Sequence, residues 1–286
     1  MRKHLYRFIS FEDFINLVIN NKDRFVRPSI WDDGYEGYLF SSLDSPEDVR
    51  HIVSEMFNNL CPRNYYAIPD NYFRMWNSKW FTYAQCWSEH PETDAMWRCY
   101  SYGNKALRIR TREDKLLAHA KSIFQENEDF AVYLKKVSYD LNKKSNVEQQ
   151  IAQMGDSKLT HETYFHKRPA FKHEREVRLL IADNRLYIRE NLSSLGVKWN
   201  IAEQVTGKND GEIIDYLTER ILSQRIDYEH SNSANVWIED AGNISAFLEG
   251  VMVHPSAPEW YVNIVQDICL QKGIRFDGQS QIYKLK

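Results

Sequence analysis

The sequence predicts a single α+β domain with a mixed or antiparallel sheet core and flanking helices. Its 286 residues are 43% hydrophobic and 27% charged, as in an ordinary globular protein, and one core can serve a chain of this length. Residues 174–183 alternate with the two-residue period of a strand, whereas residues 11–19 show the three-to-four-residue spacing of a core-facing helix. Because no internal repeat or low-complexity linker interrupts the chain, we place residues 1–286 in one domain.

Six segments carry the apolar stripe or the capping residues of a helix. Ser10 and Ser45 are N-cap candidates, Pro46 suits a first helical position, and Thr93 can cap a short helix. The predicted helices cover residues 11–19, 46–60, 94–100, 112–124, 213–222 and 258–271.

Runs rich in β-branched and aromatic residues predict the strands of the sheet. They cover residues 5–9, 24–27, 81–87, 106–111, 131–139, 174–183, 247–253 and 274–276, with residues 186–189 as a hairpin partner. Polar sequence, low in aromatic rings, separates two of these strands, and we place a helical insertion there, at about residues 142–165.

Composition and charge exclude several classes of protein. The net charge of −3 disfavours nucleic-acid binding through bulk charge, although a local basic cleft stays compatible with it. The four cysteines lack the spacing of a zinc site or a disulfide framework. No signal peptide and no apolar run of about 18 to 20 residues is present. We therefore expect a cytoplasmic protein with no membrane partner and no metal.

The charged face of residues 174–183 is the strongest candidate site in the sequence. Alternation places Glu174, Glu176 and Arg178 opposite the apolar face. Two carboxylates two residues apart on a strand lie about 6 to 7 Å from one another, close enough to act on one substrate. Basic residues and histidines between 166 and 175 would favour an anionic ligand. The alternative is a solvated, salt-bridged outer face.

Six motifs in order resemble the bacterial family catalogued as domain of unknown function 2971. One departure is the second motif, which reads Asn-Asp-Pro-Phe-Glu in the family. The motifs are Leu5-Tyr6-Arg7-Phe8, Trp31-Asp-Asp-Gly-Tyr-Glu36, Cys86-Trp-Ser-Glu89, Met96-Trp97 with Tyr100, Lys172-His-Glu-Arg-Glu-Val-Arg178 and Val251-Met-Val-His-Pro255. This resemblance implies a family without implying a reaction.

A second resemblance, to ADP-ribosyltransferases, does imply a reaction. An arginine on the first strand, a serine ending a middle strand and a Glu-x-Glu strand are similar to the Arg, Ser, Glu-x-Glu pattern of that superfamily. The resemblance implies a split sheet, with NAD as substrate. It assigns the NAD pyrophosphate to Arg7, bracing near the nicotinamide ribose to Ser88, catalysis to Glu176 and activation of the acceptor to Glu174.

Other roles follow from the chemistry of NAD cleavage. Tyr6, Trp97 or Tyr100 could stack on nicotinamide or adenine. The serine motif departs from the usual Ser-Thr-Ser, since Cys86 and Trp87 precede Ser88. The implied function is an NAD-consuming transferase or glycohydrolase, acting as a bacterial toxin or phage-defence effector. Its acceptor, whether protein, nucleic acid or water, is not identified by the sequence.

Each of these residues also has a plainer interpretation. Arg7 could pair with Glu176 or Glu36 inside the protein, Ser88 could cap a turn, and Trp97 and Tyr100 could be core residues at helical spacing. We assign no site role to two histidines and two cysteines. We expect His166 and His173 to be surface groups, and Cys86 and Cys99 to be packed thiols. Two other functions stay open: a nucleic-acid-acting or nucleotide-binding protein that grips phosphates with residues 167–178, and a non-catalytic sensor or scaffold.

Overall fold

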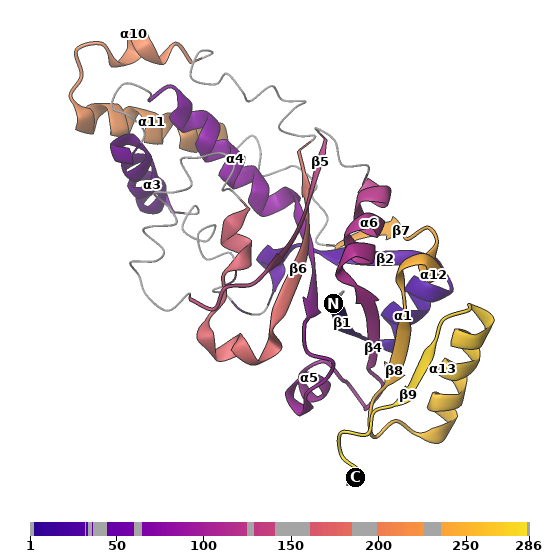
Figure 1. Cartoon of the computed structure of the whole chain (residues 1–286). Coiled ribbons are helices and arrows are strands. Elements are labelled where there is room, and N and C mark those ends of the chain that lie inside the picture. The colour runs from indigo at the N-terminus through magenta and orange to yellow at the C-terminus, as the bar shows by residue number, and fades with distance from the viewer. Residues whose placement is uncertain are drawn as a thin grey trace.

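The computed structural model describes residues 3–31, 33, 36, 45–59, 65–124, 129–140, 161–184, 199–225 and 236–284. Within these ranges nine strands form one mixed sheet with helices around it, which confirms the α+β class (Figure 1). The main strand order is β5-β6-β3-β1-β4-β8-β9, and β2 branches from β3 to pair with β7. The described strand pairs are antiparallel apart from the parallel pair β8 and β9.

The strands are short and come from all parts of the sequence. They are β1 His4–Ile9, β2 Lys22–Val26, β3 Thr82–Ser88, β4 Leu107–Arg112, β5 Phe130–Lys136, β6 Glu176–Asp183, β7 Val236–Asp240, β8 Gly250–Val253 and β9 Phe276–Gln279. The α-helices are α1 Phe11–Val18, α3 Pro46–Asn59, α4 Ala67–Phe81, α5 Asp94–Cys99, α6 Glu113–Phe124, α10 Ile201–Val205, α11 Asp210–Arg225, α12 Ile244–Phe247 and α13 Glu259–Gln271. Three 3₁₀ helices are η1 Pro28–Ile30, η3 Glu162–Phe165 and η4 Pro169–Glu174.

All six predicted helices are confirmed, with the predicted caps. Ser10, Ser45 and Thr93 each accept a hydrogen bond from the backbone N–H three residues further on, at 3.0 to 3.1 Å. These bonds satisfy N–H groups that have no partner inside the first helical turn.

Among the described α-helices and strands, four were not predicted, namely α4, α10, α12 and β7, and the strand predicted from residue 247 begins at Gly250 because α12 ends at Phe247. The α4 segment is rich in aromatic rings, and its buried side chains do not form the narrow stripe that marks a surface helix. The predicted hairpin partner 186–189 and most of the predicted insertion, residues 142–160, lie outside the described residues. The end of that insertion is η3, whose Tyr164 and Phe165 are buried in the core.

The predicted strand at 174–183 begins two residues later than expected. Pro169 starts the 3₁₀ helix η4, Arg175 has φ 42° in the left-handed region, and β6 begins at Glu176. The left-handed turn at Arg175 separates η4 from the strand, so Glu174 lies outside the sheet. The alternative of a solvated, salt-bridged outer face is right about the salt bridges and wrong about the solvent, because Arg178 is fully buried and Glu176 is 4% exposed.

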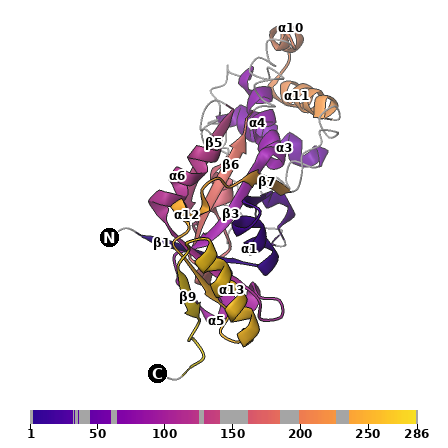
Figure 2. The same ribbon diagram turned by 90° about the vertical axis from the view of Figure 1, so that its right-hand side faces the viewer.

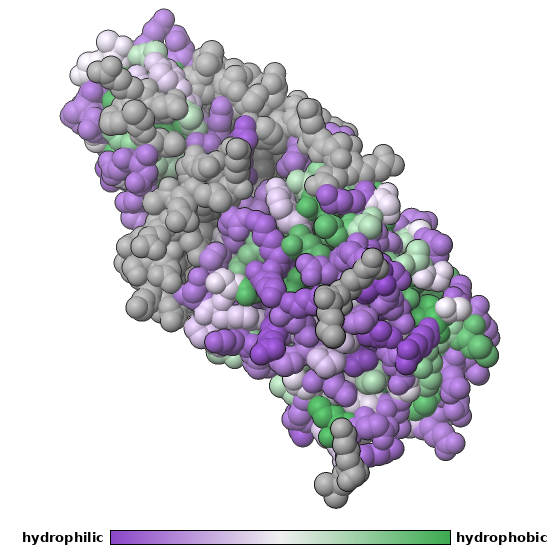
Figure 3. All heavy atoms as spheres, in the orientation of Figure 1, coloured by the Kyte–Doolittle hydropathy of each residue, from purple (hydrophilic) through white to green (hydrophobic). Residues whose placement is uncertain are grey.

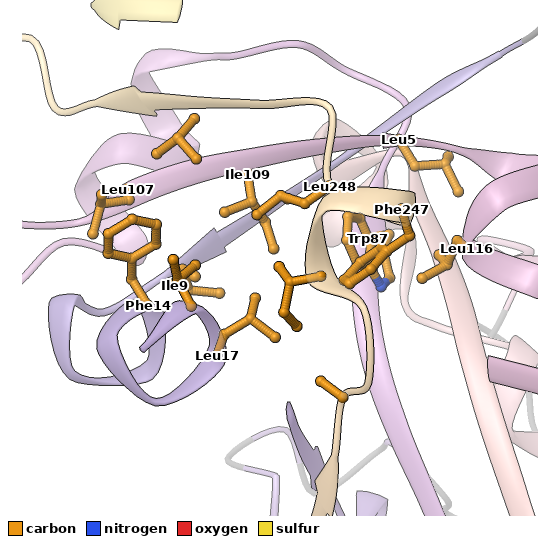
Figure 4. Packing of buried hydrophobic residues seen from close by; sticks show 14 of the residues in the cluster. Leu5, Ile9, Phe14, Leu17, Trp87, Leu107, Ile109, Leu116, Phe247 and Leu248 are labelled. Atoms are coloured by element: carbon orange, nitrogen blue, oxygen red, sulfur yellow. The ribbon is translucent and has the colours of Figure 1, made fainter. Parts of the chain in front are cut away.

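Two hydrophobic cores cover opposite faces of β6. Val177, Leu179 and Ile181 face the first core as predicted, whereas Leu180 belongs to the second. Helices α1, α6, α12 and α13 supply the first core, and Figure 4 shows Phe14 and Leu17 of α1 pointing towards it. Helices α3, α4, α10 and α11 supply the second and gather at the end of the molecule away from α13 (Figure 2).

We predict that Gly250→Ala destabilises the protein by about 1 to 3 kcal/mol, because it overpacks a close contact between strands. An added Cβ would lie 2.5 Å from Asp277 Oδ2 and 2.6 Å from Arg110 Nη2. Both atoms belong to the ion pair that ties β4 to β9. Urea unfolding measures the change, and Gly211→Ala at the start of α11 is the control, expected to be neutral or slightly stabilising. Equal effects of the two substitutions would contradict this account.

Candidate functional site

The sheet opens between β1 and β3. In the described residues, β1 pairs with β3 only at Tyr6 and Ser88, and β2 pairs with β3 only at Val26 and Ala84. By contrast, β3 and β6 pair along seven residues. The part of β3 between the two single pairs therefore borders a gap between β1 and β2. A pocket with about 610 Å³ of empty space lies at this gap.

We call this cavity the split-sheet pocket. Its walls come from three strands, one helix and the junction of η4 with β6. They consist of residues 6–8 of β1, Val26 of β2, Trp31, residues 84–88 of β3, Met96 and Tyr100 at α5, and Glu174 and Glu176.

Polar side chains form hydrogen bonds across the gap in the sheet, at the wall of the pocket. Arg7 Nη1 donates to Asp23 Oδ1 at 3.1 Å, and Arg7 Nη2 donates to the carbonyl of Arg24 at 3.2 Å. Gln85 Nε2 donates to the same carbonyl at 3.1 Å. Asp23 and Gln85 are 3% and 2% exposed, so these bonds satisfy groups that would be costly to bury alone. Arg7 is thus held at the pocket wall by Asp23.

The two predicted carboxylates reach the pocket from a sharp bend in the chain. Glu174 ends η4, Arg175 makes the left-handed turn, and Glu176 opens β6. Ser88 Oγ donates to the carbonyl of Glu174 at 2.6 Å and accepts from the N–H of His90 at 2.9 Å. Ser88 therefore caps the turn after β3 and also fixes the backbone that carries Glu174.

Five charged side chains form a buried network beneath the pocket. Lys167 Nζ lies 2.8 Å from Glu36 Oε1, 2.7 Å from Glu174 Oε2 and 3.3 Å from Glu176 Oε2. Arg178 Nε donates to Glu176 Oε1 and Arg178 Nη2 to Glu36 Oε2, both at 2.5 Å. Each of the five is at most 9% exposed. We call Glu36, Lys167, Glu174, Glu176 and Arg178 the five-charge network.

Neighbouring groups complete the hydrogen bonding of this network. Arg178 Nη1 donates to the carbonyl of Tyr164, and the guanidinium lies 4.6 Å from the ring centre of Trp31. The backbone N–H of Glu176 donates to the hydroxyl of Tyr139 at 2.8 Å. These contacts hold the Glu176 carboxylate in one orientation at the pocket floor.

Charge attraction outweighs burial in setting the pKa of Glu176 and of Lys167, whereas burial raises the pKa of Glu36 in spite of the nearby Arg178. Burial alone would raise the pKa of Glu176, but Arg178 and Lys167 lower that pKa to about 2. Burial alone would lower the pKa of Lys167, but Glu176 and Glu36 raise it above its usual value. Glu176 and Lys167 are therefore both charged at neutral pH.

Cys86 and Tyr100 are the solvent-accessible polar groups beside these carboxylates. Cys86 lies opposite Arg178 in the strand register, lines the pocket and is exposed, so the prediction of a packed thiol is wrong for it. Tyr100 is 43% exposed, and its hydroxyl lies 3.4 Å from Glu174 Oε1. Cys99, also predicted as a packed thiol, is exposed as well.

The structure brings most of the predicted site residues to one place. The lining includes Tyr6, Arg7, Ser88, Tyr100, Glu174 and Glu176. Trp97 is fully buried in a small core with Phe8 and Met96, so the core interpretation applies to it. Sequence reasoning gave no site role to Cys86, although its place two residues before Ser88 on a strand puts both on one face.

The sequence suggested that the basic residues of segment 166–178 favour an anionic ligand. In the structure several of them are paired with carboxylates, while Lys172 and Arg175 are exposed outside the pocket lining. Lys167 and Arg178 are paired with carboxylates in the five-charge network. Arg168 binds Asp33 through two hydrogen bonds, at 2.8 and 3.3 Å. His166 contacts Asp140 at 2.8 Å, and His173 is exposed outside the lining. Lys167 and Arg178 are therefore not on the surface, where a phosphate backbone would meet them.

The described part of the chain contains no group of three or more His, Cys, Asp or Glu side chains that could hold a metal ion. None of its described helices has the length and the apolar composition of a membrane span. Figure 3 shows hydrophilic side chains over most of the described surface in that view, with apolar residues in separate groups.

We predict that Lys167→Met destabilises the protein by about 3 to 5 kcal/mol, because Glu174 would lose its buried cation and Glu36 and Glu176 would share Arg178 alone. Urea unfolding measures the loss. The control is Lys172→Met, at an exposed lysine of η4, which should change stability by less than about 0.5 kcal/mol. A small effect of Lys167→Met would contradict this account, because it would show that the negative charges of the carboxylates are stabilised without Lys167.

The pKa of Glu176 also predicts an acid-sensitive stability. A carboxyl whose folded-state pKa lies near 2 stabilises the fold above its unfolded pKa of about 4.5, and this contribution disappears as pH falls from about 4.5 to 2. The amount is on the order of 3 kcal/mol. Thermal unfolding across this range should show a weaker pH dependence for Glu176→Gln than for the wild type. Glu259→Gln, at an exposed residue of α13, should keep the wild-type profile.

Comparison with known proteins gives one match. Residues 96–179 match the model of a family described as a protein of unknown function (DUF2971). That segment includes Tyr100, Lys167 and the Glu174 to Arg178 stretch, but neither β1 nor β3. No curated protein and no solved structure matches the chain. Over residues 96–179, less than a third of its length, the chain is therefore similar to the DUF2971 family, as the motifs predicted, while the resemblance to ADP-ribosyltransferases stays a prediction.

Proposed function

We propose that the chain is an NAD-consuming enzyme of the ADP-ribosyltransferase type, a transferase or NAD glycohydrolase, with its active site in the split-sheet pocket. One observation carries the proposal. Arg7 of β1, Ser88 of β3, and Glu174 and Glu176 at the η4–β6 junction line one pocket, although they lie far apart in the sequence. In this proposal the opening between β1 and β3 is the split of an ADP-ribosyltransferase-like sheet.

The chemistry of NAD cleavage suits a fixed carboxylate at the pocket floor. Breaking the bond between nicotinamide and ribose builds positive charge on the sugar, so a nearby anion stabilises the transition state more than the ground state. Glu176 is ionised at neutral pH, and Arg178 holds it in place before any substrate arrives. Such preorganisation avoids the cost of turning dipoles during the reaction.

The other lining residues have matching roles in the proposal. Arg7 presents a planar guanidinium, oriented by Asp23, to the pyrophosphate. Tyr6 and Tyr100 offer rings for stacking, a role that the buried Trp97 cannot take. Glu174 activates the acceptor, which is a protein, a nucleic acid or water.

We predict that the purified protein releases nicotinamide from NAD and that Glu176→Gln lowers this rate by about 10² to 10³, the usual effect of removing one electrostatic group. Chromatography of the nicotinamide product measures the rate, with protein and RNA offered as acceptors and with water alone. Circular dichroism checks that the variant is folded. Glu259→Gln, outside the pocket, should keep the wild-type rate. Absence of nicotinamide release under all these conditions, or equal rates in the wild type and Glu176→Gln, would refute the proposal.

A further inference from the structure

A second cavity lies between helix α1 and the two-stranded ribbon of β2 and β7. It has about 570 Å³ of empty space, part of it open to solvent. Arg7 lines this cavity as well as the split-sheet pocket, so the two adjoin at that side chain. We call it the α1–β2 cavity. Its lining consists of Arg7 and Ile9 of β1, Asp13, Asn16, Leu17 and Asn20 at α1, residues 22–24 of β2, and Ile238 of β7.

One face of α1 forms a wall of this cavity. Asp13, Asn16 and Leu17 lie three and four residues apart, the spacing that places side chains on one face of a helix. Asn20, just beyond the helix, donates from Nδ2 to Asn16 Oδ1 at 2.9 Å. This bond leaves the Nδ2 group of Asn16 without an acceptor among the described residues, and so available to a ligand.

The opposite wall is the outer face of the ribbon. Lys22 and Arg24 alternate on one side of β2, and both are exposed. Asp23, between them, points to the other side, where it is 3% exposed and accepts from Arg7. Ile238 lies opposite Arg24 in the register of β2 and β7, so it shares the face of the two cations. The cavity therefore meets two cations and one aliphatic side chain on this wall.

The two cations keep unused N–H groups. Lys22 forms no ion pair or hydrogen bond with another described residue. Its neighbour across the ribbon, Asp240, accepts instead from Asn21 Nδ2 and from the N–H of Gly242, both at 2.8 Å. Arg24 has one loose ion pair, from Nη1 to an Asp13 oxygen at 3.5 Å, and its guanidinium donates no hydrogen bond within the described part of the chain.

These donors, and not a net charge, decide which ligand fits. Asp13 and Asp240 lie near the two cations, so the local charges nearly cancel. Oxygen acceptors are what the N–H groups of Lys22 and Arg24 lack. Two residues apart on a strand, these residues are about 6 to 7 Å from one another, so one carboxylate between them can offer an oxygen to each.

An apolar surface lies beside the two cations. Ile238 is 60% exposed, which is unusual for an isoleucine in a cavity lining, while Ile9 and Leu17 are 6% and 2% exposed. A ligand with an aliphatic part would remove the exposed surface of Ile238 from water, and this stabilises the complex in proportion to the area covered. A small inorganic anion would leave that surface exposed.

We propose that the α1–β2 cavity binds a short aliphatic carboxylate. Its two oxygens accept hydrogen bonds from Lys22 and Arg24, with Asn16 Nδ2 as a further donor, and its chain covers Ile238. The site goes beyond the proposed function, because it requires no reaction in the split-sheet pocket and no contact with NAD.

The test compares probes that differ in one property at a time. 4-Methylpentanoate has the carboxylate and the chain, 4-methylpentanamide has the same shape without the charge, and acetate has the charge without the chain. Calorimetric titration of the full chain should give 4-methylpentanoate an affinity about threefold or more above that of the amide, since exposed ion pairs contribute modestly. Its affinity should exceed that of acetate by about tenfold or more, because of the buried chain.

Variants locate the binding. Lys22→Met should abolish the preference for the carboxylate over the amide, and Ile238→Ser should weaken 4-methylpentanoate without weakening acetate. Lys172→Met, at an exposed lysine of η4 outside the cavity, should bind all three probes as the wild type does. Circular dichroism checks that each variant is folded.

The comparison of probes on the wild type can overturn the proposal without any variant. No binding of 4-methylpentanoate, or equal affinities for it and for the amide, would do so. A carboxylate preference that persists in folded Lys22→Met would also overturn it, because binding would then lie elsewhere. The presence or absence of nicotinamide release from NAD bears on the proposed function alone.

Discussion

The candidate site depends on one physical constraint, namely that five charged groups buried together must compensate one another. Lys167 contacts three carboxylates and Arg178 two, so removing either cation would leave charges in a poorly solvated place. The network also joins separate parts of the chain, because Glu36 follows η1, Lys167 and Glu174 flank η4, and Glu176 and Arg178 belong to β6. The geometry of the pocket floor is therefore a consequence of charge pairing as much as of apolar packing.

The position of the pocket follows from how the strands diverge. The β3 strand keeps a continuous seven-residue register with β6 but touches β1 and β2 at one described pair each. Backbone groups and side chains at such an opening need partners, and Arg7, Asp23 and Gln85 supply them across the gap. The wall of the site is consequently built on strands, whose positions two cores fix, and not on a loop alone.

The sequence predicted six of the α-helices and most strands because their signals are local. Ser10, Ser45 and Thr93 were found as caps, since a cap needs only residues three positions apart. The start of β6 was misplaced because the apparent alternation continued back to Glu174, and only the left-handed backbone at Arg175 ends it. The helical spacing of Trp97 is the same for a core residue and for a ring that stacks on a ligand, since spacing does not show what packs against the side chain.

The charge of the site could not be predicted from the sequence, because it depends on contacts between residues that are far apart in the chain. Residues 166–178 are rich in Lys, Arg and His, so a count along the sequence suggests an anion site. Folding brings Glu36 to Lys167 and Arg178 and brings Asp33 to Arg168, and these acids come from far away in the chain. Because apolar residues of similar volume often fill a buried position at no loss of stability, stability alone is a weak reason to bury five charges beneath a pocket. What the network does provide at the pocket floor is an ionised Glu176 carboxylate that Arg178 and Lys167 hold in one orientation.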